Sequence, residues 1–150
     1  MALLIDSSLW IDFTRSSSPP ALKQQIAPWL LDASAHLAEP VMFELLRFAR
    51  PVEAQQLQAQ FATLPLLSSP PELWSEAASL GRACRRVGVT VLSLDLLIAT
   101  IALHHQATLV SFDRDFAAMA QVSALKLRQL ERAGSPSTPG PSAPLKGDQP

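Results

Sequence analysis

Residues 92–116 read LSLDLLIATIALHHQATLVSFDRDF, and this stretch holds the pattern that decides the fold. Its first half has apolar residues at helical spacing, which predicts a helix over 94–106. The side chains expected to face the core are those of Leu97, Ile98, Ile101 and Ala102. The run ATLVSF (107–112) then predicts a strand that ends at Asp113. A helix leading into a short apolar strand is the repeating unit of a parallel α/β sheet.

The same alternation extends towards both ends of the chain. The run ALLID (2–6) is continuously apolar, which is typical of a strand buried on both faces. Further strands are expected at VTVLS (89–93), at PLLS (65–68) and, along an edge, at ALKLRQL (124–130). Helices are expected around Trp10 and Phe13 with Ser7 or Ser8 as cap, over 21–32 with a kink or break at Pro28, from Pro40, after Pro51, before a C-terminal cap at Gly88, and over 115–122. The predicted fold class is α/β: a three-layer α/β/α sandwich on a mainly parallel sheet.

Length and composition indicate one domain with a single core. The chain has 150 residues, of which 48% are hydrophobic and 17% charged. Residues 133–150 are rich in proline, serine and glycine and nearly free of apolar side chains, which predicts a folded domain over 1–132 and a flexible tail. Without a long apolar run or a basic leader, and with Cys84 as the single cysteine, a cytoplasmic protein without a membrane segment is expected.

Acidic residues follow the predicted strands at comparable places. Asp6 ends the first strand, Asp95 follows VTVLS at the start of a helix, and Asp113 ends ATLVSF. Because the carboxyl ends of parallel strands meet at one edge of a sheet, these three carboxylates are expected to converge. Glu44 lies in a helix beside apolar neighbours, from which its longer side chain could reach the same edge.

Four carboxylates close together repel one another unless a cation neutralises them. Oxygen ligands favour a hard ion such as Mg²⁺ or Mn²⁺, which activates water and bridges to phosphate. Helix capping is the competing interpretation, and it applies to Asp95 and to Asp115, which precedes FAAMAQV. Strand-end geometry favours Asp113 over Asp115 as the fourth acid, with Asp115 as a helix cap, and leaves the choice open to the structure.

The segments LLIDSSLWIDF, FELLRFAR and LSLDLLIATIALHHQATLVSFDRDF, in this order and spacing, resemble the PIN-domain ribonucleases, in particular the VapC-like toxins of type II toxin–antitoxin systems. The resemblance covers about residues 2–130. It implies a PIN-like fold and an Mg²⁺- or Mn²⁺-dependent endoribonuclease that hydrolyses RNA with metal-activated water.

By this resemblance, the acidic quartet that holds the metal is Asp6, Glu44, Asp95 and Asp113. Ser7 and Ser111 match hydroxyl positions that orient such carboxylates. A nuclease also needs cations for flanking phosphates; Arg47, one turn beyond Glu44, and Arg114 are the candidates, with a solvated surface charge as the alternative.

The resemblance also implies partners: an RNA substrate, a cognate antitoxin and a second copy of the chain. The candidate antitoxin contacts are Trp10, Phe13 and Leu46. Two other functions remain open on the sequence, namely a PIN-like interaction module that has lost its metal and a phospho-accepting signalling domain. The second would need an acid pair after the first strand and a lysine after a later one; Asp6 is followed by serines, and no lysine follows LVSF.

Overall fold

A computed structural model describes residues 1–134 and contains a four-stranded parallel sheet. The strand order is β2-β1-β3-β4, so β1 and β3 occupy the middle. The strands are β1 (Leu3–Ile5), β2 (Ala35–His36), β3 (Thr108–Ser111) and β4 (Lys126–Gln129). The side chains of Leu4, Ile5, Leu109 and Val110 are fully buried, as expected for strands covered on both faces.

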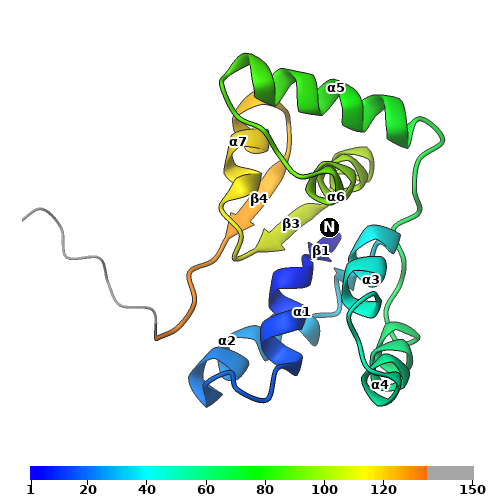
Figure 1. Ribbon diagram of the computed structural model, residues 1–150, viewed down its shortest axis with the longest axis vertical. Helices are drawn as coiled ribbons and strands as arrows, with labels where there is room; N and C mark the ends of the chain where they lie inside the picture. Colours follow the sequence, from blue (N-terminus) through cyan, green and yellow to red (C-terminus); the bar gives the residue numbers. More distant parts are fainter. Residues whose placement is uncertain (135–150) are drawn as a thin grey trace, which may run out of the picture.

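Helices cover both faces of this sheet. Figure 1 shows the sheet through the middle of the molecule, with α1 and α2 on one side and α5 and α6 on the other. The helices are α1 (Ser7–Thr14), α2 (Pro20–Leu30), α3 (Glu39–Leu46), α4 (Pro51–Phe61), α5 (Leu73–Arg86), α6 (Ser93–His104) and α7 (Asp115–Val122). The three-layer α/β sandwich predicted from the sequence is confirmed.

Helix α5 packs on the core through one stripe of small and branched side chains. The buried members of this stripe are Leu73, Ala77, Leu80 and Cys84. Trp74 lies on the outer face of α5, with 74% of its surface exposed. Gly88 adopts φ +84° directly after the helix, which is the left-handed conformation expected of a C-terminal cap.

The strand expected at 89–93 does not form. Residues 89–92 are an extended connection without sheet partners, and α6 begins at Ser93. Both sides of β1 are taken by β2 and β3, and residues 89–92 pair with neither outer strand. The short strand β2 lies beside β1 at the edge of the sheet, and no strand was expected at its residues, 35–36.

Three smaller expectations also change. PLLS forms only an isolated bridge between Leu66 and Leu37. Helix α2 continues through Pro28 as one helix, so it is not divided there. The edge strand expected within 124–130 is present as β4.

Among the residues that the structure describes, no helix is long and apolar enough to cross a membrane. The predicted tail at 133–150 lies almost entirely outside the described part of the chain, which ends at Gly134.

Candidate metal centre

Asp6 stands at the carboxyl end of β1 and begins α1. Its Oδ2 accepts a hydrogen bond from the Ser8 backbone N–H at 3.3 Å, so Asp6, and not Ser7 or Ser8, is the N-cap of α1. The same oxygen accepts a bond from Ser111 Oγ at 2.8 Å. Burial raises the pKa of Asp6 even though these hydrogen bonds oppose the shift. The first acid is therefore oriented by two neighbours and destabilised as an anion by its surroundings.

Glu44 and Ser7 meet across the gap between α3 and α1. Ser7 Oγ donates to Glu44 Oε2 at 2.6 Å, and the same hydroxyl lies 3.4 Å from Asp6 Oδ1. One serine thus links two of the acids expected in the quartet. The hydroxyl positions at Ser7 and Ser111 both orient carboxylates in this structure.

Asp95 occupies the first turn of α6 and is 7% exposed. Its Oδ2 is buried and has no hydrogen-bond partner among the described residues. Desolvation raises the pKa of Asp95 to about 7, with further contributions from the charges of Asp113 and Asp6. Asp95 does not cap its own helix, because the N-cap position is taken by Leu92.

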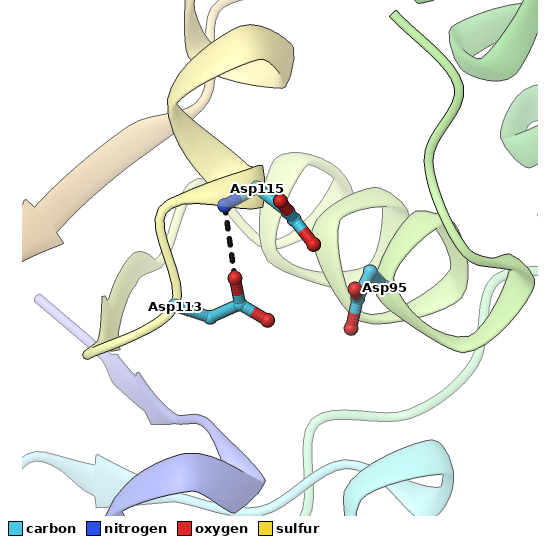
Figure 2. A group of neighbouring side chains, drawn as sticks. All are labelled: Asp95, Asp113 and Asp115. Atoms are coloured by element: carbon cyan, nitrogen blue, oxygen red, sulfur yellow. Dashed lines mark hydrogen bonds between the residues drawn. The ribbon is translucent and has the colours of Figure 1, made fainter.

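Asp113 and Asp115 follow β3 on the way into α7, and Figure 2 shows both side chains directed towards Asp95. Carboxylate oxygens of Asp95, Asp113 and Asp115 all lie within 4.8 Å of one another. Asp113 Oδ1 accepts the Asp115 backbone N–H at 2.9 Å. Asp115 was expected to cap α7; instead it is the first residue of the helix, and Asp113 accepts its N–H.

One cavity of about 500 Å³, called the acidic cavity below, joins the predicted quartet. The structure brings Asp6, Glu44, Asp95 and Asp113 together, although Asp95 arrives on a helix and not from a strand. Asp115 faces Asp95 but is exposed and does not line the cavity. The full lining is Asp6, Ser7, Ser8, Ile11, Asp12, Arg15, Ser17, Ser18, Pro19, Leu22, Glu44, Asp95, Asp113 and Arg132.

These residues fit a divalent cation of the oxygen-preferring kind. The buried Oδ2 of Asp95 lacks a partner, and several carboxylates share a small space without a basic group bonded to them among the described residues. A cation would satisfy the orphaned oxygen and lower the pKa of Asp95. The donor set is carboxylate and hydroxyl oxygen only, which suits Mg²⁺ or Mn²⁺.

The two arginines proposed for phosphate contact are not brought to the cavity. Arg47 lies over the ring of Phe48, with its guanidinium carbon 4.2 Å from the ring centroid. Arg114 makes a 3.8 Å ion pair with Glu131 on the surface. Neither residue lines the acidic cavity. The sequence spacing that suggested them fixes only their distance from an acid along the chain, not the direction of the side chain.

Sequence reasoning missed three residues of this region. Ser8 Oγ accepts the Phe112 backbone N–H at 3.2 Å and lies 3.3 Å from Ser111 Oγ, which ties α1 to β3. Asp12 and Arg132 form an ion pair at the wall of the cavity. No motif marks this pair, because its members lie at opposite ends of the folded chain.

Comparison with known proteins agrees with this geometry. The family model described as PIN domain matches residues 3–122. Ribonuclease VapC11 from Mycobacterium tuberculosis is 33% identical over 129 residues, which cover 83% of this chain and 96% of that relative.

Two solved structures share the fold at lower identity. A VapBC2 complex from Rickettsia felis bound to a DNA fragment from its promoter has a TM-score of 0.63 at 16% identity, covering 87% of this chain and 100% of the other. Mycobacterium tuberculosis VapC20, described as a sarcin–ricin loop cleaving toxin, has a TM-score of 0.63 at 15% identity, covering 83% and 99%. The chain therefore belongs to the PIN domain family and, within it, to the VapC ribonucleases.

Proposed function

We propose that this protein is an Mg²⁺- or Mn²⁺-dependent endoribonuclease and the toxin of a toxin–antitoxin pair. The observation that carries this proposal is the convergence of four carboxylates in one cavity, with the buried Asp95 Oδ2 left without a hydrogen bond. The proposed reaction, hydrolysis of RNA, follows from membership of the VapC ribonucleases. The proposed site residues are the carboxylates that line the acidic cavity. Because the proposed substrate is RNA, the proposed location of this activity is the cytoplasm.

Asp6, Asp95 and Asp113 are the residues that would hold the metal, with Glu44 as a further candidate ligand. Ser111 keeps Asp6 oriented, and Ser7 does the same for Glu44. Asp115 faces Asp95 from outside the cavity and would serve a second cation if one binds.

When bound, the ion lowers the pKa of a water and offsets the charge that develops on the phosphodiester. The protein's part is to aim the carboxylates at one point: Ser111 and Ser7 hold Asp6 and Glu44, and the first turn of α6 carries Asp95. In-line attack of water on phosphorus would break the bond to one ribose oxygen; the attacking water would lose a proton to solvent, and the leaving oxygen would take one up from solvent.

The test is cleavage of total RNA and of a structured RNA by the purified protein with Mn²⁺, Mg²⁺ or EDTA. Asp6→Asn and Asp95→Asn are each expected to reduce the rate by at least about 10²-fold, because each removes a charged ligand. Glu76→Gln is a matched control, since it removes one negative charge from an exposed position on α5. Metal-independent cleavage, or unchanged rates in both Asn variants, would refute the proposal.

An antitoxin is proposed to bind a groove beside the acidic cavity. This groove has a volume of about 660 Å³ and is lined by residues of α1, α3 and α4, among them Ile11, Leu45 and Phe48. Trp10 cannot take part as predicted, because it is only 2% exposed and packs edge-on against Phe61. Phe13 and Leu46 are half-buried and remain candidate contacts. The test is co-purification of this protein with the product of a neighbouring small reading frame. The variant Phe48→Glu is expected to weaken that binding.

A homodimer is proposed from the family resemblance. Large apolar side chains at Phe43, Trp74 and Leu92 are exposed and are suited to contact another copy. Light scattering after size exclusion measures the mass directly. A monomer at concentrations where cleavage is observed would contradict this part of the proposal.

The other two functions make different predictions for the same samples. A module without metal would not be stabilised against heat by Mn²⁺, whereas a ligand that binds only the folded state raises the melting temperature. A phospho-accepting domain would gain mass with acetyl phosphate.

A further inference from the structure

Two arginines, Arg15 and Arg132, line the acidic cavity, and several contacts hold Arg132 in place. Arg132 Nε donates to Asp12 Oδ2 at 2.6 Å. Its guanidinium carbon lies 4.9 Å from the centroid of the Phe112 ring, and Phe112 is the residue immediately before Asp113. The arginine therefore rests on the same end of β3 that presents Asp113 to the cavity.

The backbone around Arg132 is held on both sides by one side chain of α2. Gln25 Nε2 donates to the Glu131 carbonyl at 2.7 Å, and Gln25 Oε1 accepts the Ala133 N–H at 2.8 Å. An amide that bonds the residues before and after an arginine fixes its Cα position. This clamp places the end of the described chain against the cavity.

The ion pair with Asp12 uses only part of the guanidinium. Asp12 is buried, with 9% of its side chain exposed, whereas 45% of the Arg132 side chain is exposed. Within residues 1–134, Nη1 and Nη2 of Arg132 have no hydrogen-bond acceptor. A guanidinium held through Nε presents these two nitrogens as a planar pair of donors, which is the geometry that binds phosphate oxygens.

The location relative to the acids matches the needs of a polyanionic substrate. Ser8 and Asp12 lie on one face of α1, and four residues of helix span about 6 Å. Arg132 and Asp12 line the same cavity as the acids, so a strand whose reacting phosphate lay at the acids would bring a neighbouring phosphate towards Arg132. The acidic lining repels that flanking phosphate, and Arg132 and Arg15 are the basic residues among the lining side chains.

We propose that Arg132 is a substrate-binding residue whose terminal guanidinium nitrogens hold a phosphate of the RNA strand next to the acidic end of the cavity, with Asp12, Phe112 and Gln25 keeping it in place. This inference rests on the proposed ribonuclease function. The competing role is purely structural: Arg132 would only neutralise the buried Asp12.

Two variants separate the roles. Arg132→Lys can keep the ion pair with Asp12, but lysine has a single side-chain nitrogen. It therefore lacks the two terminal guanidinium nitrogens proposed to bind phosphate. Asp12→Asn combined with Arg132→Gln replaces the ion pair by a neutral pair and leaves no buried charge alone. Arg128→Gln is the control, because Arg128 is an exposed arginine on β4 that does not line the cavity.

The measurements are kcat and KM on a short RNA with Mn²⁺, the salt dependence of RNA binding on an Asp95→Asn background, and the melting temperature with and without Mn²⁺. For Arg132→Lys and the double variant, KM is expected to rise about three- to tenfold, with kcat within about twofold of the wild type. In the double variant, the slope of log K against log salt should decrease in magnitude by about 0.7, as for one lost phosphate contact on a single strand. The rise in melting temperature on adding Mn²⁺ should equal that of the wild type in these variants. The control variant should match the wild type in KM and in salt slope.

Normal KM and salt slope in both Arg132 variants, with wild-type cleavage intact, would overturn the inference. Unchanged RNA binding together with weaker inhibition by the antitoxin would also overturn it and assign Arg132 to the protein partner. Failure of the proposed function looks different, because the wild-type protein itself would then show no metal-dependent cleavage.

Discussion

Individual carboxylates in the acidic cavity differ in what stabilises their charge. Asp6 receives hydrogen bonds from Ser8 and Ser111, whereas Asp95 has a buried oxygen with no partner in the described chain. Burial and like charges therefore act on Asp95 without a protein group to offset them, which raises its pKa to about 7. Of the acids in the cavity, Asp95 depends most on a cation.

This dependence predicts how pH changes the stability of the metal-free protein. An acid whose folded-state pKa is raised holds a proton that the unfolded chain releases, so stability falls as pH rises between about 4 and 7. In EDTA at pH 8, Asp95→Asn is expected to melt roughly 2–4 °C above the wild type, and at pH 4 the two should melt together. Mn²⁺ should stabilise the wild type more at pH 8 than at pH 5.5, and the Asn variant little at either. Scanning fluorimetry across pH measures this; an Asn variant that melts lower at pH 8 contradicts it.

Ser111 is the residue at which the hydroxyl contribution is most directly testable. Its Oγ donates to Asp6, accepts the Asp113 backbone N–H at 2.9 Å and is fully buried. Ser111→Ala is expected to raise the Mn²⁺ concentration for half-maximal cleavage about tenfold, because both acids lose an orienting bond. Ser75→Ala, an exposed serine on α5, is the control. An unchanged metal requirement would show that the Ser111 hydroxyl is not needed to orient Asp6.

At the scale of elements, the connection from α5 to α6 delivers Asp95 to the cavity. The connection turns at Gly88, whose φ of +84° is strained for other residues, and a Cβ built there would meet nothing within 4 Å. Only the backbone conformation therefore opposes a larger side chain at this position.

Gly88→Ala is accordingly expected to lower the free energy of unfolding by about 1 kcal/mol, and Gly88→Asn by less, since asparagine tolerates the left-handed region better. Urea unfolding at one pH measures both. Equal losses for alanine and asparagine would mean that the turn is held by something other than φ.

The arrangement of these elements was predictable to the extent that local patterns determine it. Continuous apolar runs identified β1 and β3, and their carboxyl ends placed Asp6 and Asp113 on one edge. The segment 89–93 has equally good strand residues but no partner, because strand formation depends on pairing with a distant segment, which local sequence does not reveal. Asp95 reached the expected place because the start of α6 faces the same edge.

At the scale of the whole molecule, residues 131–133 bind to the first two helices. Arg132 pairs with Asp12 across a sequence separation of 120 residues, and Gln25 bonds Glu131 and Ala133. Contacts of this range leave no periodicity in the sequence, which is why Arg132 could not be predicted whereas the acids at strand ends could.

These contacts predict where the chain can be shortened. A chain ending at Gly134 is expected to keep the melting temperature and cleavage rate of the full chain, in line with a folded domain over 1–132. A chain ending at Leu130 leaves the buried Asp12 without its partner and should lose at least about 2 kcal/mol of stability. Chemical unfolding and the RNA assay on both chains test this boundary. Loss of activity in the chain that ends at Gly134 would assign a role to residues 135–150.

The pairing of β1 with β3 also determines when the enzyme can become active. Leu3 pairs with Thr108, so the first strand has its neighbour in the middle of the sheet only after most of the chain exists. On the ribosome, Asp6, Glu44 and Asp95 emerge before β3 and Asp113 do, and a domain generally folds as one unit. The cavity therefore stays incomplete until β3 and Asp113 have left the ribosome, and we expect no cleavage of RNA by the nascent chain before that point.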